Sequence, residues 1–177
     1  MGMQAVADAM ARLTKVLERR PDMGLSPDAP AYAHWSGPQM PLRIVCRHPN
    51  GQEVCTDLAP ELGGGGGQVS PGWLYRAGLA SCASTSIVFL AAIEGVVLRT
   101  LRVEAAASSD SRGMVGLSDE SGRLVNPAPV DQRLIVAIGA DGAAAEQLRE
   151  LVRRALERSP IPTAVQVHGL DVQVDVV

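Results

Sequence analysis

The sequence predicts an α+β fold in which antiparallel strands pack around one buried helix. Residues 73–93 carry a single charge, Arg76, and are otherwise apolar or small, so a helix there has no broad polar face. Residues 42–58 alternate in polarity around an Asn-Gly pair, which is the strongest short signal for a hairpin. Residues 143–158 space their apolar side chains three and four apart, as an amphipathic helix does.

The buried helix is predicted to begin at Pro71 and to end before Gly95. Ser70 can accept a hydrogen bond from the free amides of the first turn, and a proline at the first helical position loses no hydrogen bond. Five glycines, residues 63–67, precede this start and are interpreted as a flexible approach to the helix. A phosphate cradle is the alternative, but the tract lacks the Lys-Ser/Thr ending of a P-loop and the strand-GxGxxG order of a dinucleotide site.

A two-residue turn at Asn50-Gly51 would place Cys46 directly opposite Cys55, and His48 opposite Glu53. The Cα atoms of such a non-hydrogen-bonded pair lie about 4.5 Å apart, so a disulfide is geometrically possible. Two small core residues are the alternative, which a reducing compartment favours. Both interpretations stay open at the level of sequence.

The remaining segments complete the predicted organisation. Residues 3–19 form an amphipathic helix, and residues 21–30, with three prolines, form a linker, so residues 1–31 precede a domain over residues 32–177. In that domain, strands are predicted over LRTLRVEAAASSD, QRLIVAIGA and HGLDVQVDVV, with a polar hairpin or long loop between the first two. The period-two alternation of the last segment closes the sheet.

Composition excludes several functional classes. The net charge of -3 and the absence of a basic run argue against nucleic acid as a partner. The longest uncharged apolar stretch, residues 77–93, is shorter than about 20 residues, and the first helix is interrupted by charges, so neither a membrane span nor a signal peptide is expected. Three cysteines without a regular framework indicate a cytoplasmic protein. The scattered His34, His48 and His168 predict no metal site, and no cofactor motif is present.

The order of motifs resembles the OsmC/Ohr family of thiol peroxidases over residues 32–177. A Gly-Gly tract leads to a Ser-Pro helix start, the small-residue first half of the helix runs to Ala-Ser-Cys, and a later amphipathic helix closes on Ser-Pro. This resemblance implies an OsmC-like fold, an intertwined homodimer, and Cys82 as the peroxidatic thiol. It also implies a second cysteine where this chain has Ser159, and in the Ohr branch a glutamate where this chain has Gly72. A low aromatic content of 3% independently favours a dimer that adds buried area.

Cys82 would react with a peroxide as its thiolate, which needs a nearby cation or hydrogen-bond donors. By segment, Arg43 and Arg47 are the candidate cations, whereas Arg76 is turned about 120° away from Cys82 on the same helix. The prediction is a hydroperoxide reductase that uses Cys82 alone, with a small organic hydroperoxide as substrate and an external thiol as reductant. The alternative is a non-catalytic dimer that binds a small apolar ligand or senses oxidants; a purely structural dimer is a third possibility.

Overall fold

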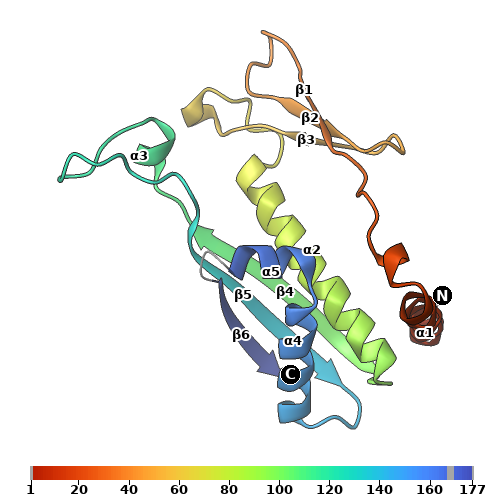
Figure 1. Ribbon diagram of the computed structural model, residues 1–177. Helices are drawn as coiled ribbons and strands as arrows, with labels where there is room; N and C mark the ends of the chain where they lie inside the picture. The colour runs from red at the N-terminus through yellow and green to blue at the C-terminus, as the bar shows by residue number, and fades with distance from the viewer. Residues whose placement is uncertain (1, 167–169, 177) are drawn as a thin grey trace. The chain divides into compact units, whose positions relative to one another are not determined.

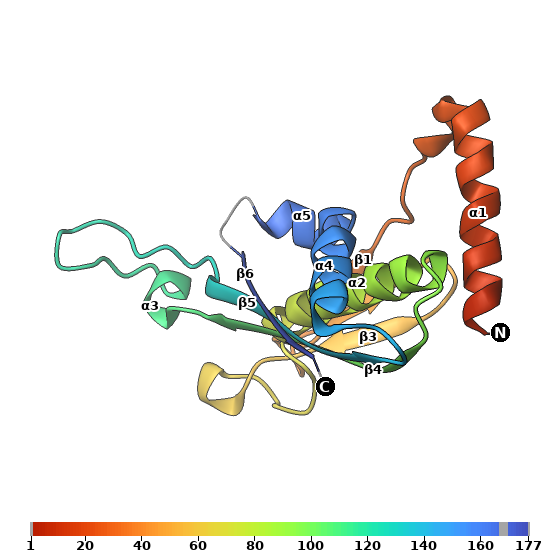
Figure 2. The same cartoon turned by 90° about the horizontal axis from the view of Figure 1, so that it is seen from below.

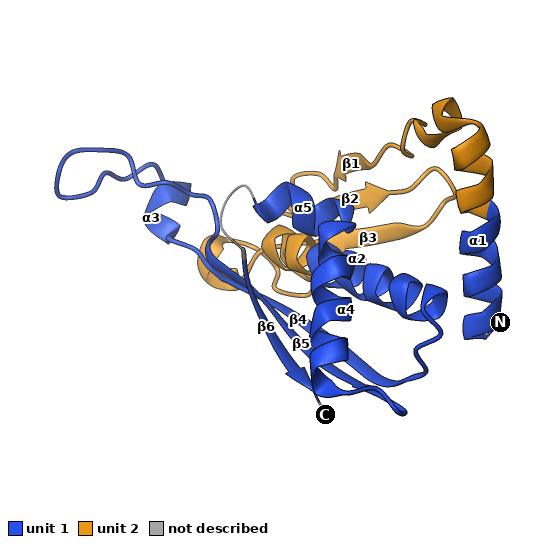
Figure 3. Ribbon diagram, turned by 60° about the horizontal axis from the view of Figure 1, so that its bottom comes forward, with its two compact units in different colours: residues 1–12, 78–177 blue, residues 13–77 orange. Residues whose placement is uncertain are grey.

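The computed structural model describes residues 2–166 and 170–176. By its internal contacts the chain divides into two compact units (Figure 3). The smaller unit comprises residues 13–77, and the larger comprises residues 1–12 together with residues 78–177. Helix α2 (Pro71–Ile93) starts in the smaller unit and continues in the larger one. The predicted boundary between residues 31 and 32 is a separate division of the chain and stays a prediction.

The N-terminal helix and the two hairpin strands of the first sheet have the predicted types, whereas the remaining strand of that sheet, residues 32–35, was not predicted. Helix α1 (Met3–Arg19) has the predicted bounds and buries none of its residues, and a 3-10 turn (Pro21–Gly24) follows it. The smaller unit then holds an antiparallel sheet in the order β1-β2-β3 (Figure 1). Its strands are β1 (Tyr32–Trp35), β2 (Ile44–Arg47) and β3 (Glu53–Thr56), and a 3-10 turn (Pro60–Leu62) leads on to the glycine tract.

The β2–β3 hairpin forms as predicted, but its register differs by one residue. Arg47 pairs with Glu53, so Cys46 lies opposite Val54 rather than opposite Cys55. The prediction overlooked Pro49, which suits the second position of a type I turn and favours a three-residue loop closed by a left-handed glycine. Gly51 has that conformation, with φ at 90°, and its amide donates to the His48 carbonyl at 2.9 Å.

This register overturns two predicted pairings. Cys46 shares a face of the sheet with Val54, whereas Cys55 pairs with Val45 on the other face, since neighbouring side chains alternate along a strand. Both thiols are free, and they do not face one another for a disulfide. The predicted pair of His48 with Glu53 is also wrong, because Glu53 accepts a hydrogen bond from Arg47 Nε at 2.7 Å.

The glycine tract is a closely packed loop rather than a flexible approach or an anion cradle. Asp57 is almost fully buried, and its carboxylate accepts the amides of Leu58 at 2.8 Å and Gly65 at 3.1 Å. The neighbouring amides also bind internally: that of Gly64 donates to the Ala59 carbonyl at 3.1 Å and that of Gly66 to the Leu58 carbonyl at 3.0 Å. Amides already engaged in this way are not free to hold a phosphate.

Helix α2 begins as the sequence predicts but buries one stripe rather than its whole circumference. Ser70 Oγ accepts the amide of Trp73 at 3.1 Å, the expected N-terminal cap. The buried residues recur at helical spacing and are Leu79, Ala83, Ile87, Leu90, Ala91 and Ala92. Side chains on the other side, including Ser81, Thr85 and Phe89, are exposed. By length and hydropathy alone α2 could cross a membrane, but the core helix of a globular domain has the same properties.

The larger unit is built on a second three-stranded sheet, in the order β4-β5-β6. Strand β4 (Leu98–Ser108) pairs antiparallel with β5 (Val130–Ala140), and β5 pairs parallel with β6 (Leu170–Val176). The α+β class is confirmed, but this sheet is mixed rather than wholly antiparallel. The reason is the connection: α4 (Ala145–Glu157) and α5 (Pro160–Gln166) carry the chain back across the sheet, as a parallel pair requires.

Between β4 and β5, residues 109–129 form an arm that extends away from the sheet (Figure 2). It contains the short helix α3 (Ser111–Met114), with the Asp110 side chain accepting the amide of Arg112. An isolated bridge joins Ser118 to Leu124. This agrees with the prediction of a polar hairpin or long loop.

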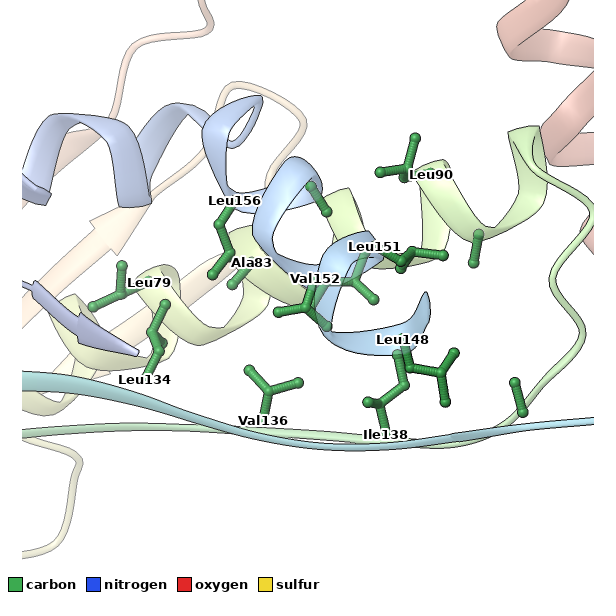
Figure 4. Close-up of a cluster of buried hydrophobic side chains, with 14 of the residues drawn as sticks. Leu79, Ala83, Leu90, Leu134, Val136, Ile138, Leu148, Leu151, Val152 and Leu156 are labelled. Atoms are coloured by element: carbon green, nitrogen blue, oxygen red, sulfur yellow. The ribbon is translucent and has the colours of Figure 1, made fainter. Parts of the chain in front are cut away.

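The hydrophobic core of the larger unit lies between α2, α4 and the inner face of β5 (Figure 4). The five apolar positions of α4 that were predicted to point inward are all buried: Leu148, Leu151, Val152, Ala155 and Leu156. Leu134, Val136 and Ile138 of β5 face them from the sheet. The core is built from aliphatic side chains and alanine, as the low aromatic content requires.

Ile87 gives a direct test of this core, because it is fully buried in the middle of α2. Replacing Ile87 with alanine is expected to lower the free energy of unfolding by about 2–5 kcal/mol, since both burial and packing contacts are lost. The matched control is Ile93→Ala on the same helix, where the side chain is 54% exposed. Urea unfolding followed by circular dichroism measures both; equal destabilisation by the two variants would contradict this core.

Candidate functional site

Cys82 lies on the part of α2 that belongs to the larger unit, beside the buried stripe of the helix. Its neighbour Ala83 is fully buried in the core, whereas Cys82 itself is partly exposed and its thiol is free. The backbone hydrogen bonds of the helix on both sides fix the Cα and Cβ atoms of Cys82. Cys82 therefore lies at the border between the buried stripe of the helix and the surface.

Ser159 lies against Cys82 although 77 positions separate the two residues in sequence. It occupies the junction between α4 and α5, where the carbonyl of Leu156 accepts its amide at 3.1 Å. The Ser159 side chain is completely buried, and its Oγ lies 3.3 Å from Cys82 Sγ, within hydrogen-bonding distance. The structure thus brings together two of the four predicted site residues.

Ile161 is a neighbour of this site that the sequence analysis missed. A Cβ atom built on Gly78, one helical turn before Cys82, would lie 3.9 Å from Ile161 Cδ1. The space that Gly78 leaves is therefore bordered by an apolar side chain that is itself 40% exposed. The sequence contained a signal for this neighbour, because Ile161 lies only two positions after Ser159 and is flanked by a proline on each side.

Arg43 and Arg47, the predicted cations, both belong to the smaller unit and differ in their surroundings. Arg47 is exposed and bound to Glu53 across the hairpin. Arg43 is partly buried, and within the described residues its buried Nε has no hydrogen-bond partner. A buried guanidinium group with an unpaired N–H is energetically costly, so Arg43, of the two predicted cations, has unused hydrogen-bonding capacity.

In the larger unit, the arginines of α4 are engaged by carboxylates. Arg154 donates to both carboxylate oxygens of Glu94, at 2.6 and 2.9 Å, and these hydrogen bonds raise the pKa of Arg154 above its usual value. Arg153 is bound to Glu150 and Glu157. Arg158, which directly precedes Ser159, is exposed and forms no ion pair among the described residues, and the sequence analysis did not single it out.

A pocket of about 450 Å³ lies elsewhere in the larger unit, where the end of α2 approaches α4. Its lining includes Glu94, Asp141, Glu150 and Arg154, and contains neither Cys82 nor Ser159. Charged walls of this kind are unsuited to a small apolar ligand. This pocket therefore does not supply the apolar binding site of the alternative hypothesis.

The predicted absence of a metal site concerns three histidines in separate segments. Within residues 2–166 and 170–176, no three His, Cys, Asp or Glu side chains cluster as metal ligands. His48 Nδ1 accepts the amide of Asn50 in the hairpin turn. His168 lies outside the described residues.

A family model described as "OsmC-like protein" matches residues 64–175, more than half of the chain. The chain belongs to the OsmC family. The match includes both Cys82 and Ser159, and it agrees with the resemblance carried by the motifs. No curated protein matches the chain.

Solved structures of OsmC-like proteins share the fold. An organic hydroperoxide resistance protein OsmC from Legionella pneumophila is 20% identical, with a TM-score of 0.60, and the alignment covers 86% of this chain and 98% of that one. An OsmC-like protein from Mycoplasma pneumoniae is 14% identical over the same shares, with a TM-score of 0.68. The organic hydroperoxide resistance protein OhrB of Bacillus subtilis is 19% identical, with a TM-score of 0.54, over 85% of this chain and 98% of that one.

This OsmC-like protein has Gly72 near the start of α2, where the resemblance to the Ohr branch implies a glutamate. A Cβ atom at position 72 would lie 3.6 Å from Arg76 Nη1, one turn further along the helix. A guanidinium group therefore lies over the position where the resemblance implies a glutamate. Within the smaller unit, this start of α2 presents positive rather than negative charge.

Proposed function

We propose that this OsmC-like protein reduces organic hydroperoxides with Cys82 as its single reacting thiol and an external thiol as reductant. The observation that carries the proposal is the setting of Cys82: the residue is partly exposed, lies in the interior of a helix, and has its Sγ 3.3 Å from a buried hydroxyl. A thiol packed only as a small hydrophobic side chain has no need of such a polar partner. Membership of the OsmC family and the shared fold with organic hydroperoxide resistance proteins support the same chemistry.

The proposed reaction has two stages. The Cys82 thiolate attacks one oxygen of the hydroperoxide, the O–O bond breaks, and the departing alkoxide takes up a proton to leave as an alcohol. Cys82 is then a sulfenic acid, which an external thiol converts to a mixed disulfide with release of water. A second external thiol releases Cys82 as a thiol, so that one hydroperoxide oxidises two external thiols to a disulfide.

The test uses the full chain with Cys46→Ser and Cys55→Ser, which leaves one thiol. Cumene hydroperoxide is supplied with dithiothreitol, and its consumption is followed against the same protein alkylated with iodoacetamide. We expect catalytic consumption by the unmodified protein only, and a dimedone adduct at residue 82 when the dithiol is omitted. Consumption that does not exceed the alkylated control would reject the proposal and favour the non-catalytic alternative.

A cation for the thiolate, predicted at Arg43 or Arg47, stays a prediction from the sequence, because both arginines belong to the smaller unit and Cys82 belongs to the larger one.

The homodimer, the cytoplasmic location and the absence of nucleic-acid and membrane partners remain predictions from the sequence and the resemblance. The proposed chemistry requires none of them for its first stage, which takes place at a sulfur within one chain.

A further inference from the structure

Ser159 is a fully buried residue whose side chain has one evident task. Its backbone is held at both ends, because its amide donates to the Leu156 carbonyl and its carbonyl accepts the amide of Thr163 at 2.9 Å. Among the described residues, the partner of its hydroxyl is Cys82 Sγ. A buried hydroxyl without a partner is costly, so this contact is part of what allows a serine at a completely buried position.

The direction of this hydrogen bond depends on the state of the sulfur. With a neutral thiol, either the S–H or the O–H group can donate. A thiolate has no proton, so the Ser159 hydroxyl must then be the donor. Hydrogen bonds to a charged acceptor are roughly twice as strong as those between neutral groups. Ser159 therefore favours the charged form of Cys82 over the neutral one.

This inference rests on the proposed function. We propose that Ser159 donates the hydrogen bond that stabilises the Cys82 thiolate. After oxidation, Ser159 does not react with the sulfenic acid of Cys82, which an external thiol then reduces. A cysteine at position 159 would instead condense with the sulfenic acid, forming an S–S bond and releasing water. The serine oxygen cannot form such a bond, so the two electrons that reduce the Cys82 sulfenic acid back to a thiol must come from external thiols.

The contact distance makes this substitution informative. Cys82 Sγ and Ser159 Oγ are 3.3 Å apart, and an S–S bond of about 2.05 Å requires two sulfurs at these positions to approach by about one ångström. The two residues come from different segments, α2 and the turn between α4 and α5. A single substitution, Ser159→Cys, should therefore allow an internal disulfide with Cys82.

The first experiment measures the thiolate without any peroxide. In the background with Cys46→Ser and Cys55→Ser, the rate of iodoacetamide alkylation at residue 82 is followed against pH for Ser159, Ser159→Ala and Ser159→Thr. We expect alkylation near neutral pH to slow about tenfold in the alanine variant and to keep the parent rate with threonine, which keeps the hydroxyl. An unchanged alkylation rate across the pH range in Ser159→Ala would overturn the proposed hydrogen bond to the thiolate.

The second experiment tests the geometry in the same background and does not depend on threonine fitting the site. Ser159→Cys is treated with diamide, and intact mass after blocking of free thiols reports the internal disulfide. Thr163→Cys, one helical turn further and exposed, is the control. We expect complete disulfide formation at position 159 and little at 163. If no disulfide forms in Ser159→Cys, the inference that side chain 159 stands where a second sulfur could pair with Cys82 is overturned.

These measurements separate the inference from the proposed function. If the alkylation profile and the disulfide are as expected but the protein consumes no hydroperoxide, the inferred hydrogen bond stands and the proposed peroxidase activity is rejected. If Ser159→Ala consumes hydroperoxide at the parent rate and has an unchanged alkylation profile, the proposed activity stands and the role of Ser159 is rejected.

Discussion

Replacement of Cys82 with serine is expected to reduce hydroperoxide consumption to the uncatalysed background. The substituted hydroxyl has nearly the shape of the thiol and can still exchange a hydrogen bond with Ser159, so the local packing is retained. An alcohol is not ionised at neutral pH and does not accept oxygen from a peroxide, so the first step has no nucleophile. The loss should therefore be complete rather than partial.

Two further cysteines provide the controls for Cys82→Ser. Cys46 and Cys55 are free thiols on opposite faces of the first sheet, and each is partly exposed, as Cys82 is. Cys46→Ser and Cys55→Ser should each retain the parent rate with cumene hydroperoxide and dithiothreitol. If Cys82→Ser were as active as the parent, or if either control lost the activity, the reacting sulfur would lie elsewhere.

Gly64→Ala is expected to lower the free energy of unfolding by about 3 kcal/mol, at the upper end of the cost of overpacking. A Cβ atom at this position would lie 2.0 Å from the Leu58 carbonyl oxygen and 2.8 Å from Asp57 Oδ1. The nearest obstacle is backbone, so rotation of a side chain cannot relieve it. The loop must open, and the buried Asp57 carboxylate then loses the amide of Gly65.

Gly67→Ala is the matched control, since it lies in the same tract and its nearest non-local neighbour is Arg43 Nη2 at 3.8 Å, an ordinary contact. Neither glycine has a positive φ, so the comparison isolates steric contact from backbone conformation. Urea unfolding of the full chain measures both variants. A loss in Gly64→Ala no greater than that in Gly67→Ala would contradict the close approach of the tract to Leu58.

Local patterns predicted α1, α2 and α4 closely, but not the short helices α3 and α5. The start of α2 depends on Ser70 and Pro71, which are adjacent in sequence to the amides they serve, and the structure has the same cap. The inward face of α4 depends on spacings of three and four residues, and all five predicted positions are buried. In both cases the interacting groups lie within one or two helical turns of each other, so a short window of sequence contains the information.

Non-local contacts were predicted less well. One residue, Pro49, changes the loop length and turns Cys46 and Cys55 to opposite faces, because side chains in a strand alternate with period two. The role of the glycine tract depends on Asp57, which no pattern within the tract reveals. Ile161 adjoins Gly78 through the packing of α5 on α2, which spacing along the chain does not encode.

The sequence by itself determined the α+β class, the bounds of the main helices, the OsmC-like motifs, and Cys82 and Ser159 as the residues to compare. These properties follow from hydrogen bonds and apolar faces that repeat over a few neighbouring residues. Only the tertiary structure decided that β6 runs parallel to β5, that an amide of the glycine tract donates to the Asp57 carboxylate, and that the buried Ser159 hydroxyl lies within hydrogen-bonding distance of the Cys82 sulfur. The first and the last depend on groups far apart in the chain that the packing of the larger unit brings together, and the second depends on a carboxylate eight residues before the glycine amide that it accepts.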